Sequence, residues 1–412
     1  MNAGKIWHTL FLEERPSLGL SFFRIFVALT TGLHVIPSFF HLDDNYLSTA
    51  FKMVNHSFFT TGVLEVVGKG PDWLVIAFVG LFLLSWLFFL IGLFSQISCI
   101  LMTLCCYFFY ALNDFHIGTL SWDILLVTLF LMCVTPYHGD YFSIDAFRRN
   151  DPDAYCRKRP FFLQRLLQLQ IASTFFYTAL YKITAQGNWL KGNPIYALMN
   201  GPSIGVVKDF LLKEWLAAHP HVCYGLGVSI VAMELSLPFL WFISKTRRGA
   251  IMIGFMFHIM LLLALDVPAI FFFLFPAQML LFIHPQSITR WIERRRSRAY
   301  KARVIYDGQC GFCRGAVARL KVADLWGHLI YEPSQEVLSE MKLVEGEGTL
   351  GGFDAFCRLC HLLPMFYPML LLVYLPGVSW IGRWSYAWIA RNRYLLHRAG
   401  ACADERCFRK KV

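Results

Sequence analysis

The sequence predicts a mainly α-helical membrane domain followed by a small α/β domain. Of the 412 residues, 57% are hydrophobic and only 16% are charged, a balance too apolar for a soluble protein of this length. Long apolar runs fill the chain up to residue 284, and beyond a basic segment short strand-like and helix-like segments replace them. We therefore expect a transmembrane domain over 1–289, a basic linker over 290–303 and a second domain over 304–412.

Eight apolar runs are long enough to cross the roughly 30 Å hydrocarbon core of a bilayer as helices. They cover residues 19–38, 73–92, 97–113, 121–137, 166–182, 223–243, 249–266 and 268–284. The first run has no small-residue cleavage site after its apolar core, so we expect it to stay in the protein as a span. The prediction is a polytopic domain of about eight spans.

Basic residues predict the orientation of these spans. Lys and Arg gather after the fourth, sixth and eighth runs, whereas the long intervals 39–72 and 183–222 contain few of them. Cytoplasmic loops of membrane proteins are enriched in Lys and Arg. The N-terminus and the C-terminal domain are therefore both predicted to be cytoplasmic. This bias also explains the net charge of +11, so we expect membrane lipid and no nucleic acid as a partner.

Two thiols stand at a predicted turn between a strand and a helix, in the run Tyr-Asp-Gly-Gln-Cys-Gly-Phe-Cys at 306–313. Cys310 would lie at the helix N-terminus, where partial positive charge favours the thiolate. This makes Cys310 the candidate nucleophile and Cys313 the candidate resolving thiol. A pair of structural thiols or half of a zinc site is the alternative. Because the cytoplasm keeps most thiols reduced, we expect a transient, catalytic disulfide.

Strands and helices are predicted to alternate in the second domain. Strands are expected at 304–306 and 329–331, helices at 311–325, 334–344 and 353–363, and turns at 345–352. The order strand, Cys-x-x-Cys, helix, strand is the one in which thioredoxin-like folds begin. The apolar segment 362–380 contains three prolines that would interrupt a spanning helix. We interpret it as a buried or membrane-apposed part of this domain.

Three separated motifs of the second domain resemble the DCC family of thiol-disulfide oxidoreductases. They are the run at 306–313, Gly-Gly-Phe-Asp-Ala-Phe at 351–356, and Tyr-x-Trp-x-Ala-Arg-Asn-Arg-Tyr at 386–394. The resemblance implies a thioredoxin-like fold and disulfide exchange with a thiol or disulfide substrate protein. It assigns catalysis to Cys310 and Cys313, and the supporting positions would be Tyr306, Asp307 and Gly308.

The first domain is similar to the HTTM domain, the transmembrane module whose best-known relative is the vitamin K-dependent gamma-carboxylase. The similarity covers about residues 10–285 and lies in Leu20–Arg24, Tyr141–Asp145, Thr178–Ile183, Asn188–Gly192, Glu234 and His258. In the carboxylase, a lysine in the segment that resembles Tyr181-Lys182-Ile183 deprotonates vitamin K hydroquinone. The resemblance therefore implies Lys182 as a base and a quinone as ligand or cofactor.

Glu234 and His258 fall inside the sixth and seventh predicted spans. Ionisable groups at membrane depth are costly to leave unpaired, so we expect them to contact each other or Lys182. The alternatives are a lysine that extends its ammonium to the membrane interface and a purely structural pair.

Four further cysteines suggest a zinc site, and the alternative is that the protein binds no metal. Cys357 and Cys360 are three residues apart on a predicted helix and share one face. Cys402 and Cys407 would complete a tetrahedral set.

The leading functional hypothesis is a membrane-tethered thiol-disulfide oxidoreductase coupled to a lipid or a quinone in the membrane domain. A carboxylase-like enzyme or quinone oxygenase with Lys182 as base is the second hypothesis. A non-catalytic, lipid-binding membrane scaffold is the third.

Overall fold

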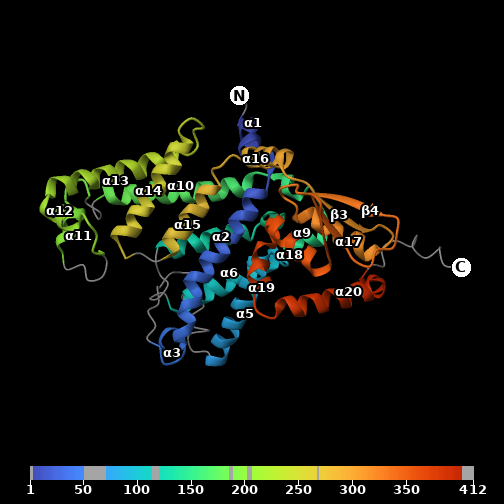
Figure 1. Ribbon diagram of the computed structural model, residues 1–412. Coiled ribbons are helices and arrows are strands. Elements are labelled where there is room, and N and C mark those ends of the chain that lie inside the picture. Colours follow the sequence, from blue (N-terminus) through green and yellow to red (C-terminus); the bar gives the residue numbers. More distant parts are fainter. Residues whose placement is uncertain are drawn as a thin grey trace. The chain divides into compact units, whose positions relative to one another are not determined.

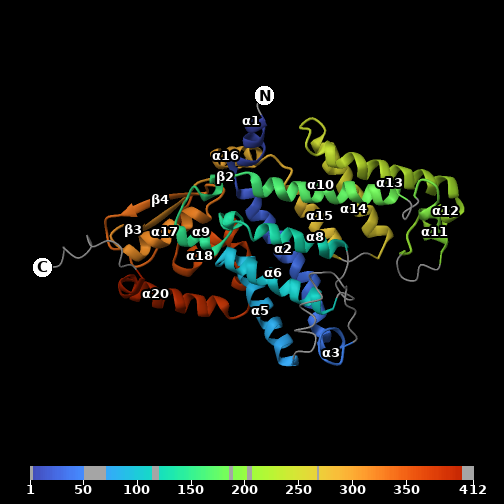
Figure 2. The same cartoon turned by 180° about the vertical axis from the view of Figure 1, so that it is seen from behind.

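The structure, a computed structural model, describes residues 3–50, 71–113, 120–184, 189–201, 207–266 and 269–400. Two compact units make up the chain (Figures 1 and 2). The first unit comprises Met1–Gly139 and Lys158–Pro285, and the second comprises Asp140–Arg157 and Gln286–Val412. The chain therefore crosses between the units at three points. Asn188, Cys402 and Cys407 lie outside the described residues.

The eight predicted spans all coincide with helices of the first unit. These helices are α2 (Leu18–Val35), α5 (Asp72–Ile91), α6 (Ser95–Leu112), α8 (Leu120–Met132), α10 (Phe162–Ile183), α13 (Pro220–Leu240), α14 (Arg247–Ala264) and α15 (Ala269–Leu280). Among the described residues, five helices are long and apolar enough to cross a membrane on their own, namely those that begin with α2, α5, α6, α13 and α14. The predicted mainly α, polytopic membrane fold is confirmed.

Short elements connect these helices. They are α1 (Ala3–Trp7), the π-helical turn η1 (His8–Leu12), β1 (Glu14–Pro16), η2 (Ile36–His41), α3 (Leu42–Asn45), η3 (Pro136–Gly139), β2 (Lys158–Pro160), α11 (Pro194–Asn200) and α12 (Lys213–Ala218). Strand β1 pairs antiparallel with β2 and so fixes the start of the chain beside the start of α10.

The interior of the first unit consists of two apolar clusters. In the larger cluster Phe23, Phe82 and Phe109 are fully buried, which joins α2, α5 and α6. In the second cluster Phe175 of α10 lies 5.5 Å from Phe275 of α15, measured between ring centroids. This second cluster forms the floor of a cavity between α10, α13, α14 and α15 that is described below.

A mixed four-stranded sheet with the order β4-β3-β5-β6 organises the second unit. Its strands are β3 (Ala302–Asp307), β4 (Leu329–Ser334), β5 (Lys342–Glu345) and β6 (Gly348–Gly351). Strand β3 is parallel to β4 and antiparallel to β5, and β5 forms a hairpin with β6. The helical elements are α9 (Ile144–Arg149), η4 (Ala154–Cys156), α16 (Pro285–Arg298), α17 (Gly311–Ala323), α18 (Gly352–Leu362), η5 (Pro364–Phe366), α19 (Tyr367–Val373) and α20 (Val378–Gly400).

The core of this unit joins the sheet to its two central helices. Val304 of β3 and Leu343 of β5 are opposite each other in the sheet and fully buried, together with Leu359 of α18. Leu320 of α17 completes the contact. The strand order, with the Cys-x-x-Cys turn between β3 and α17, is thioredoxin-like and confirms the predicted fold.

The prediction of a helix over 334–344 is wrong. The chain instead leaves β4 at Ser334 and enters β5 at Lys342, and the turns expected at 345–352 contain β6. Residues 342–344 pair with 303–305 of the central strand β3 and bury Leu343. Long-range strand pairing here outweighs the helix propensity of Glu, Leu, Met and Lys in this segment, which is only a few tenths of a kcal/mol per residue.

The segment 140–157, which follows the fourth predicted span, packs within the second unit. The Tyr141 hydroxyl donates a hydrogen bond to the carbonyl of Val322, at 2.6 Å. The ring of Phe147 stacks on that of Phe366, with centroids 5.9 Å apart. Sequence patterns gave no sign of this assignment, because the contacts join residues separated by about 180 to 220 positions.

Candidate functional site

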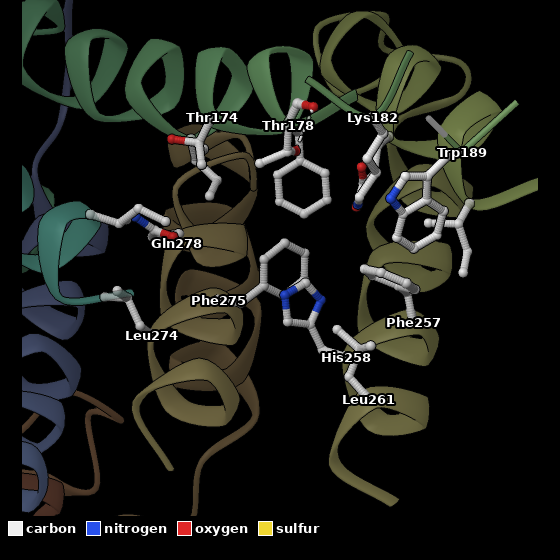
Figure 3. A pocket seen from close by; sticks show the side chains of 15 residues that line it. Thr174, Thr178, Lys182, Trp189, Phe257, His258, Leu261, Leu274, Phe275 and Gln278 are labelled. Carbon is white, nitrogen blue, oxygen red and sulfur yellow. Dashed lines mark hydrogen bonds and ion pairs between the residues drawn. The ribbon is translucent and has the colours of Figure 1, made fainter. Parts of the chain in front are cut away.

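An ion pair lies at the end of α10 in the first unit. The Lys182 ammonium contacts Oε1 of Glu234, which projects from α13, and the Lys182 side chain is 18% exposed while that of Glu234 is 6% exposed. The Nζ atom of Lys182 also lies 4.9 Å from the centroid of the Trp189 ring. Figure 3 shows Lys182 and Trp189 on one side of a cavity. The contact expected between Lys182 and Glu234 is present.

The cavity beside this ion pair has a volume of about 260 Å³ and mostly apolar walls. Phe257 and Leu261 of α14 and Phe275 of α15 line it (Figure 3). His258 stacks on Phe275 with ring centroids 3.5 Å apart, and its Nδ1 donates to the carbonyl of Gly254 at 2.9 Å. His258 thus lines the same cavity, but in the described part of the chain it makes no hydrogen bond to Lys182 or Glu234.

One polar atom of this cavity lacks a partner. Oε2 of Glu234 is buried and has no hydrogen-bond partner among the described residues. A buried carboxylate oxygen without a donor is unfavourable, so a hydroxyl or N–H group of a ligand would bind here with a gain in free energy. The cavity can therefore accept a small, largely apolar molecule that carries one hydrogen-bond donor.

The two motif thiols occupy the start of α17 in the second unit. Cys310 is the residue that precedes the helix, and its Sγ accepts a hydrogen bond from the backbone N–H of Cys313 at 3.4 Å. A sulfur in this position faces the partial positive charge of the helix N-terminus, which stabilises a thiolate. The side chain of Cys310 is fully buried and that of Cys313 is half-buried.

Asp307 shapes the turn that contains Cys310. Its Oδ1 accepts hydrogen bonds from the backbone N–H groups of Gln309 and Cys310, at 3.0 and 3.1 Å. Its Oδ2 lies 3.4 Å from Nη2 of Arg393, which α20 supplies, and both side chains are less than a tenth exposed. Two backbone donors and one buried guanidinium therefore stabilise the carboxylate and fix the turn.

Gly308 fits this turn because there is no room for a side chain. A Cβ atom at this position would lie 3.0 Å from Cβ of Pro333 and 3.1 Å from the carbonyl oxygen of Ser334. Tyr306, the third predicted supporting residue, lines a cavity next to Cys313. The structure thus brings all three predicted supporting residues close to the dithiol.

The cavity next to Cys313 has a volume of about 290 Å³. Its apolar wall includes Phe312, Val317, Phe356, Phe366 and Ile389. Tyr386 of α20 also lines it, and its hydroxyl accepts a hydrogen bond from the backbone N–H of Met341 at 3.3 Å. Burial raises the pKa of the Cys313 thiol to about 12. Cys313 is therefore neutral at physiological pH in this conformation.

The remaining predicted cysteines form no metal centre among the residues that the structure describes. Cys357 is half-buried and Cys360 buried on α18. No group of three or more His, Cys, Asp or Glu side chains in the described ranges could hold a metal ion. The two other cysteines of the alternative zinc set lie outside those ranges.

A family profile described as the HTTM domain matches residues 13–286. The chain belongs to the HTTM family. A second profile, described as DCC1-like thiol-disulfide oxidoreductase, matches residues 304–399 and follows the HTTM domain directly. No curated protein and no solved structure matches the chain.

The HTTM match includes the ion-pair cavity, and the DCC1-like match includes the dithiol and its cavity. At the family level this HTTM protein is thus a membrane protein with an oxidoreductase domain. Arg393 lines the dithiol cavity but was not among the predicted site residues. The signal that could have identified it was its place in the motif at 386–394.

Proposed function

We propose that the protein is a membrane-bound thiol-disulfide oxidoreductase in which Cys310 and Cys313 exchange two electrons with a substrate disulfide. The observation that supports this most directly is the pairing of Cys310, at the N-terminus of α17, with Cys313, at the wall of a cavity. The position of Cys310 at a helix N-terminus activates its thiol. The position of Cys313 at the cavity wall lets a substrate approach the pair.

In the proposed reaction the Cys310 thiolate attacks one sulfur of the substrate disulfide. The substrate S–S bond breaks, a mixed disulfide forms, and the departing thiolate takes up a proton. Cys313 then loses its proton and attacks the sulfur of Cys310, which releases the second substrate thiol. The substrate is reduced by two electrons and the protein keeps a Cys310–Cys313 disulfide. The reverse sequence oxidises a substrate dithiol.

Access to the dithiol constrains the substrate. Cys310 is fully buried, so a folded substrate protein can reach its sulfur only after the residues around it move. A small disulfide or a flexible peptide can enter the cavity that Cys313 lines, and a smaller movement then suffices to bring it to Cys310. We therefore expect small disulfides to react faster than disulfides of folded proteins.

The test is to trap the mixed disulfide in the full-length protein. Cys313→Ser removes the resolving thiol, so the adduct between Cys310 and a small disulfide should accumulate and be located by mass spectrometry. Cys310→Ser is the matched control and should accumulate no adduct. An adduct that forms only in Cys310→Ser, on Cys313, would show that the roles are reversed. An adduct in neither variant would exclude thiol exchange at this site.

The ion-pair cavity supports a second candidate function, the deprotonation of a ring hydroxyl of a reduced quinone in the HTTM domain. The observation in its favour is the unpaired Oε2 of Glu234 in an apolar cavity next to Lys182. Oε2 of Glu234 would hold the quinol hydroxyl, the Lys182 ammonium would pass one proton to Glu234, and the neutral amine would then take the hydroxyl proton as the base of a carboxylase-like or oxygenase reaction.

Lipid extraction and mass spectrometry of the purified protein should then yield a quinone at a substantial fraction of the protein amount. In Glu234→Ala the yield should fall at least about tenfold, because the acceptor for the hydroxyl is lost. The control variant is Asp209→Ala, which removes the fully exposed acidic partner of Lys213. It should leave the quinone yield unchanged. Equal yields from both variants would contradict this second function and favour a non-catalytic lipid-binding scaffold.

We further propose that the second unit faces the cytoplasm. Its two pieces, 140–157 and 286–412, are separated by α10, α13, α14 and α15. If each of these four helices crosses the membrane once, both pieces lie on the same side, and the arginines there favour the cytoplasm. A membrane-impermeant thiol reagent applied to intact cells should therefore leave Cys156 and Cys357 unlabelled, and labelling there would contradict this orientation.

A further inference from the structure

The second unit has an apolar surface that its own residues leave uncovered. It consists of side chains from α19, the following turn and α20, which together are called the α19–α20 face. Its members are Leu371, Leu372, Tyr374, Leu375, Trp380, Ile381, Trp384 and Trp388, each of them at least half exposed. Leu371 is 78% exposed and Trp380 75%, values unusual for such large apolar side chains in contact with water.

Helix α20 has two opposite faces. Successive residues of an α-helix are about 100° apart around its axis, so the tryptophans at 380, 384 and 388 fall within an arc of roughly 80°. Tyr386 and Arg393 lie on the other side of the helix and line the dithiol cavity. Arg391 is exposed and falls within the arc of the tryptophans. The exposed arc therefore combines large aromatic rings with a cation and contains no acidic residue.

Aromatic side chains and arginines on one helix face are typical of helices that lie in the interfacial region of a bilayer. Indole rings place an apolar body in the lipid and a polar N–H among the headgroups, and arginine pairs with phosphates. The leucines of α19 extend the same surface. Together α18 and α19 are apolar enough to pass as a span, but the chain bends by 106° between them. Leu359 of α18 is buried in the core of this unit, so along this stretch the exposed apolar side chains come from α19 and α20.

The chain connections restrict what can cover the α19–α20 face. The second unit joins the first at three points, and each lies five to eight residues from the nearest end of α8, α10 or α15. Extended chain spans at most about 3.5 Å per residue, so these connections keep the second unit within about 18 to 28 Å of the ends of these three helices, which we expect to lie in the membrane. A bilayer surface is therefore always within reach, whereas a second copy or another protein must first be encountered.

We propose that the α19–α20 face lies in the interfacial region of the membrane that the first unit spans. The helix α20 then separates lipid on its tryptophan side from the dithiol cavity on its other side. The contact of the α19–α20 face with lipid depends only on the side chains of that face. It does not depend on which residues exchange electrons.

Photolabelling of the full-length protein in nanodiscs tests the proposal. The nanodiscs contain phosphatidylcholine, phosphatidylglycerol and a lipid with a diazirine in its acyl chain, and mass spectrometry locates the label. The α19–α20 face should be labelled at least about fivefold more than Val337, which is 68% exposed elsewhere on the second unit. Labelling no stronger than at Val337 would overturn the proposal. Trp384→Glu should reduce labelling of α20 severalfold, and Val337→Glu is its matched control.

Fluorescence quenching provides a second measurement that keeps the helix intact. Trp380, Trp384 and Trp388 are replaced together by Phe, and quenching by brominated lipid and by aqueous iodide is compared with the parent protein. The fraction of emission quenched by brominated lipid should fall. A fall in the iodide-quenched fraction alone would place these rings in water. An unchanged response to both quenchers would place them against protein, either the first unit or a second copy, and both results overturn the proposal.

Discussion

The two cavities of this protein are similar in size and differ in the polar groups on their walls. The cavity of the HTTM domain has a volume of about 260 Å³ and that of the DCC1-like domain about 290 Å³, and most of the lining of both is apolar. The first presents the ion pair of Lys182 and Glu234, whereas the second presents a thiol, Cys313, together with the ion pair of Asp307 and Arg393. Apolar walls of this kind can hold many small molecules, so the few polar groups decide the chemistry. On the functions proposed above, the first cavity would serve proton transfer and the second electron transfer.

The strongest way to test this difference is to remove the predicted nucleophile. In Cys310→Ser the rate of disulfide exchange should fall at least about 1000-fold, because the hydroxyl that replaces the thiol does not ionise at neutral pH. The measurement is reduction of a small disulfide by the purified protein. Glu234→Gln should leave this rate unchanged. A loss of exchange in Glu234→Gln as well would show that the two cavities do not act separately.

Breaking the ion pair of the first cavity should destabilise that unit. Lys182→Met leaves the buried carboxylate of Glu234 without its cation and should lower the free energy of unfolding by about 3 kcal/mol. Combining it with Glu234→Gln should recover most of the loss. The control is Lys213→Met, which breaks the ion pair of Lys213 with Asp209, a side chain that is 98% exposed. This substitution should change the free energy of unfolding by at most about 0.5 kcal/mol. Unfolding in detergent measures all three, and equal losses at Lys182 and Lys213 would contradict a structural ion pair.

The pH dependence of alkylation tests the environment of Cys313. Burial raises its pKa to about 12, so below that pH the neutral thiol predominates and only the small thiolate fraction reacts. That fraction grows tenfold per pH unit, so the rate should rise by about 100-fold from pH 7.5 to 9.5 without levelling off. Mass spectrometry follows the modification of Cys313 alone. A plateau near pH 9, as an exposed thiol gives, would show that the cavity is open to water.

The smallest effect is expected from the hydroxyl of Tyr386, which joins α20 to Met341, the residue before β5. Tyr386→Phe keeps the ring but leaves the backbone N–H of Met341 without its acceptor, which should cost about 1 kcal/mol and speed hydrogen exchange at that amide. Tyr374→Phe is the control, because its hydroxyl bonds to an exposed histidine, His361. Equal effects of the two substitutions would indicate that α20 does not pack against Met341 in solution.

Several features were predictable because their causes are local. The spans follow from apolar runs of bilayer length, and the strand before Cys310 and the helix after it follow from a short apolar run and a turn motif. The segment 334–344 was predicted incorrectly because its helix propensity is local, whereas its pairing with β3 is not. The expectation that Lys182 and Glu234 meet was correct because burial inside adjacent spans leaves a charge few partners other than an opposite charge.

By itself the sequence determined that the chain is a membrane protein with a thioredoxin-like domain, and it pointed to Lys182, Glu234, Cys310 and Cys313 as candidate site residues. Only the tertiary structure decided that 140–157 packs with the second unit, that Arg393 of α20 pairs with Asp307, and that Cys313 lines the cavity. These features depend on contacts between residues tens to hundreds of positions apart. Hydropathy and motif spacing describe a segment and its near neighbours, so they contain no information about which distant side chain will cover a given thiol.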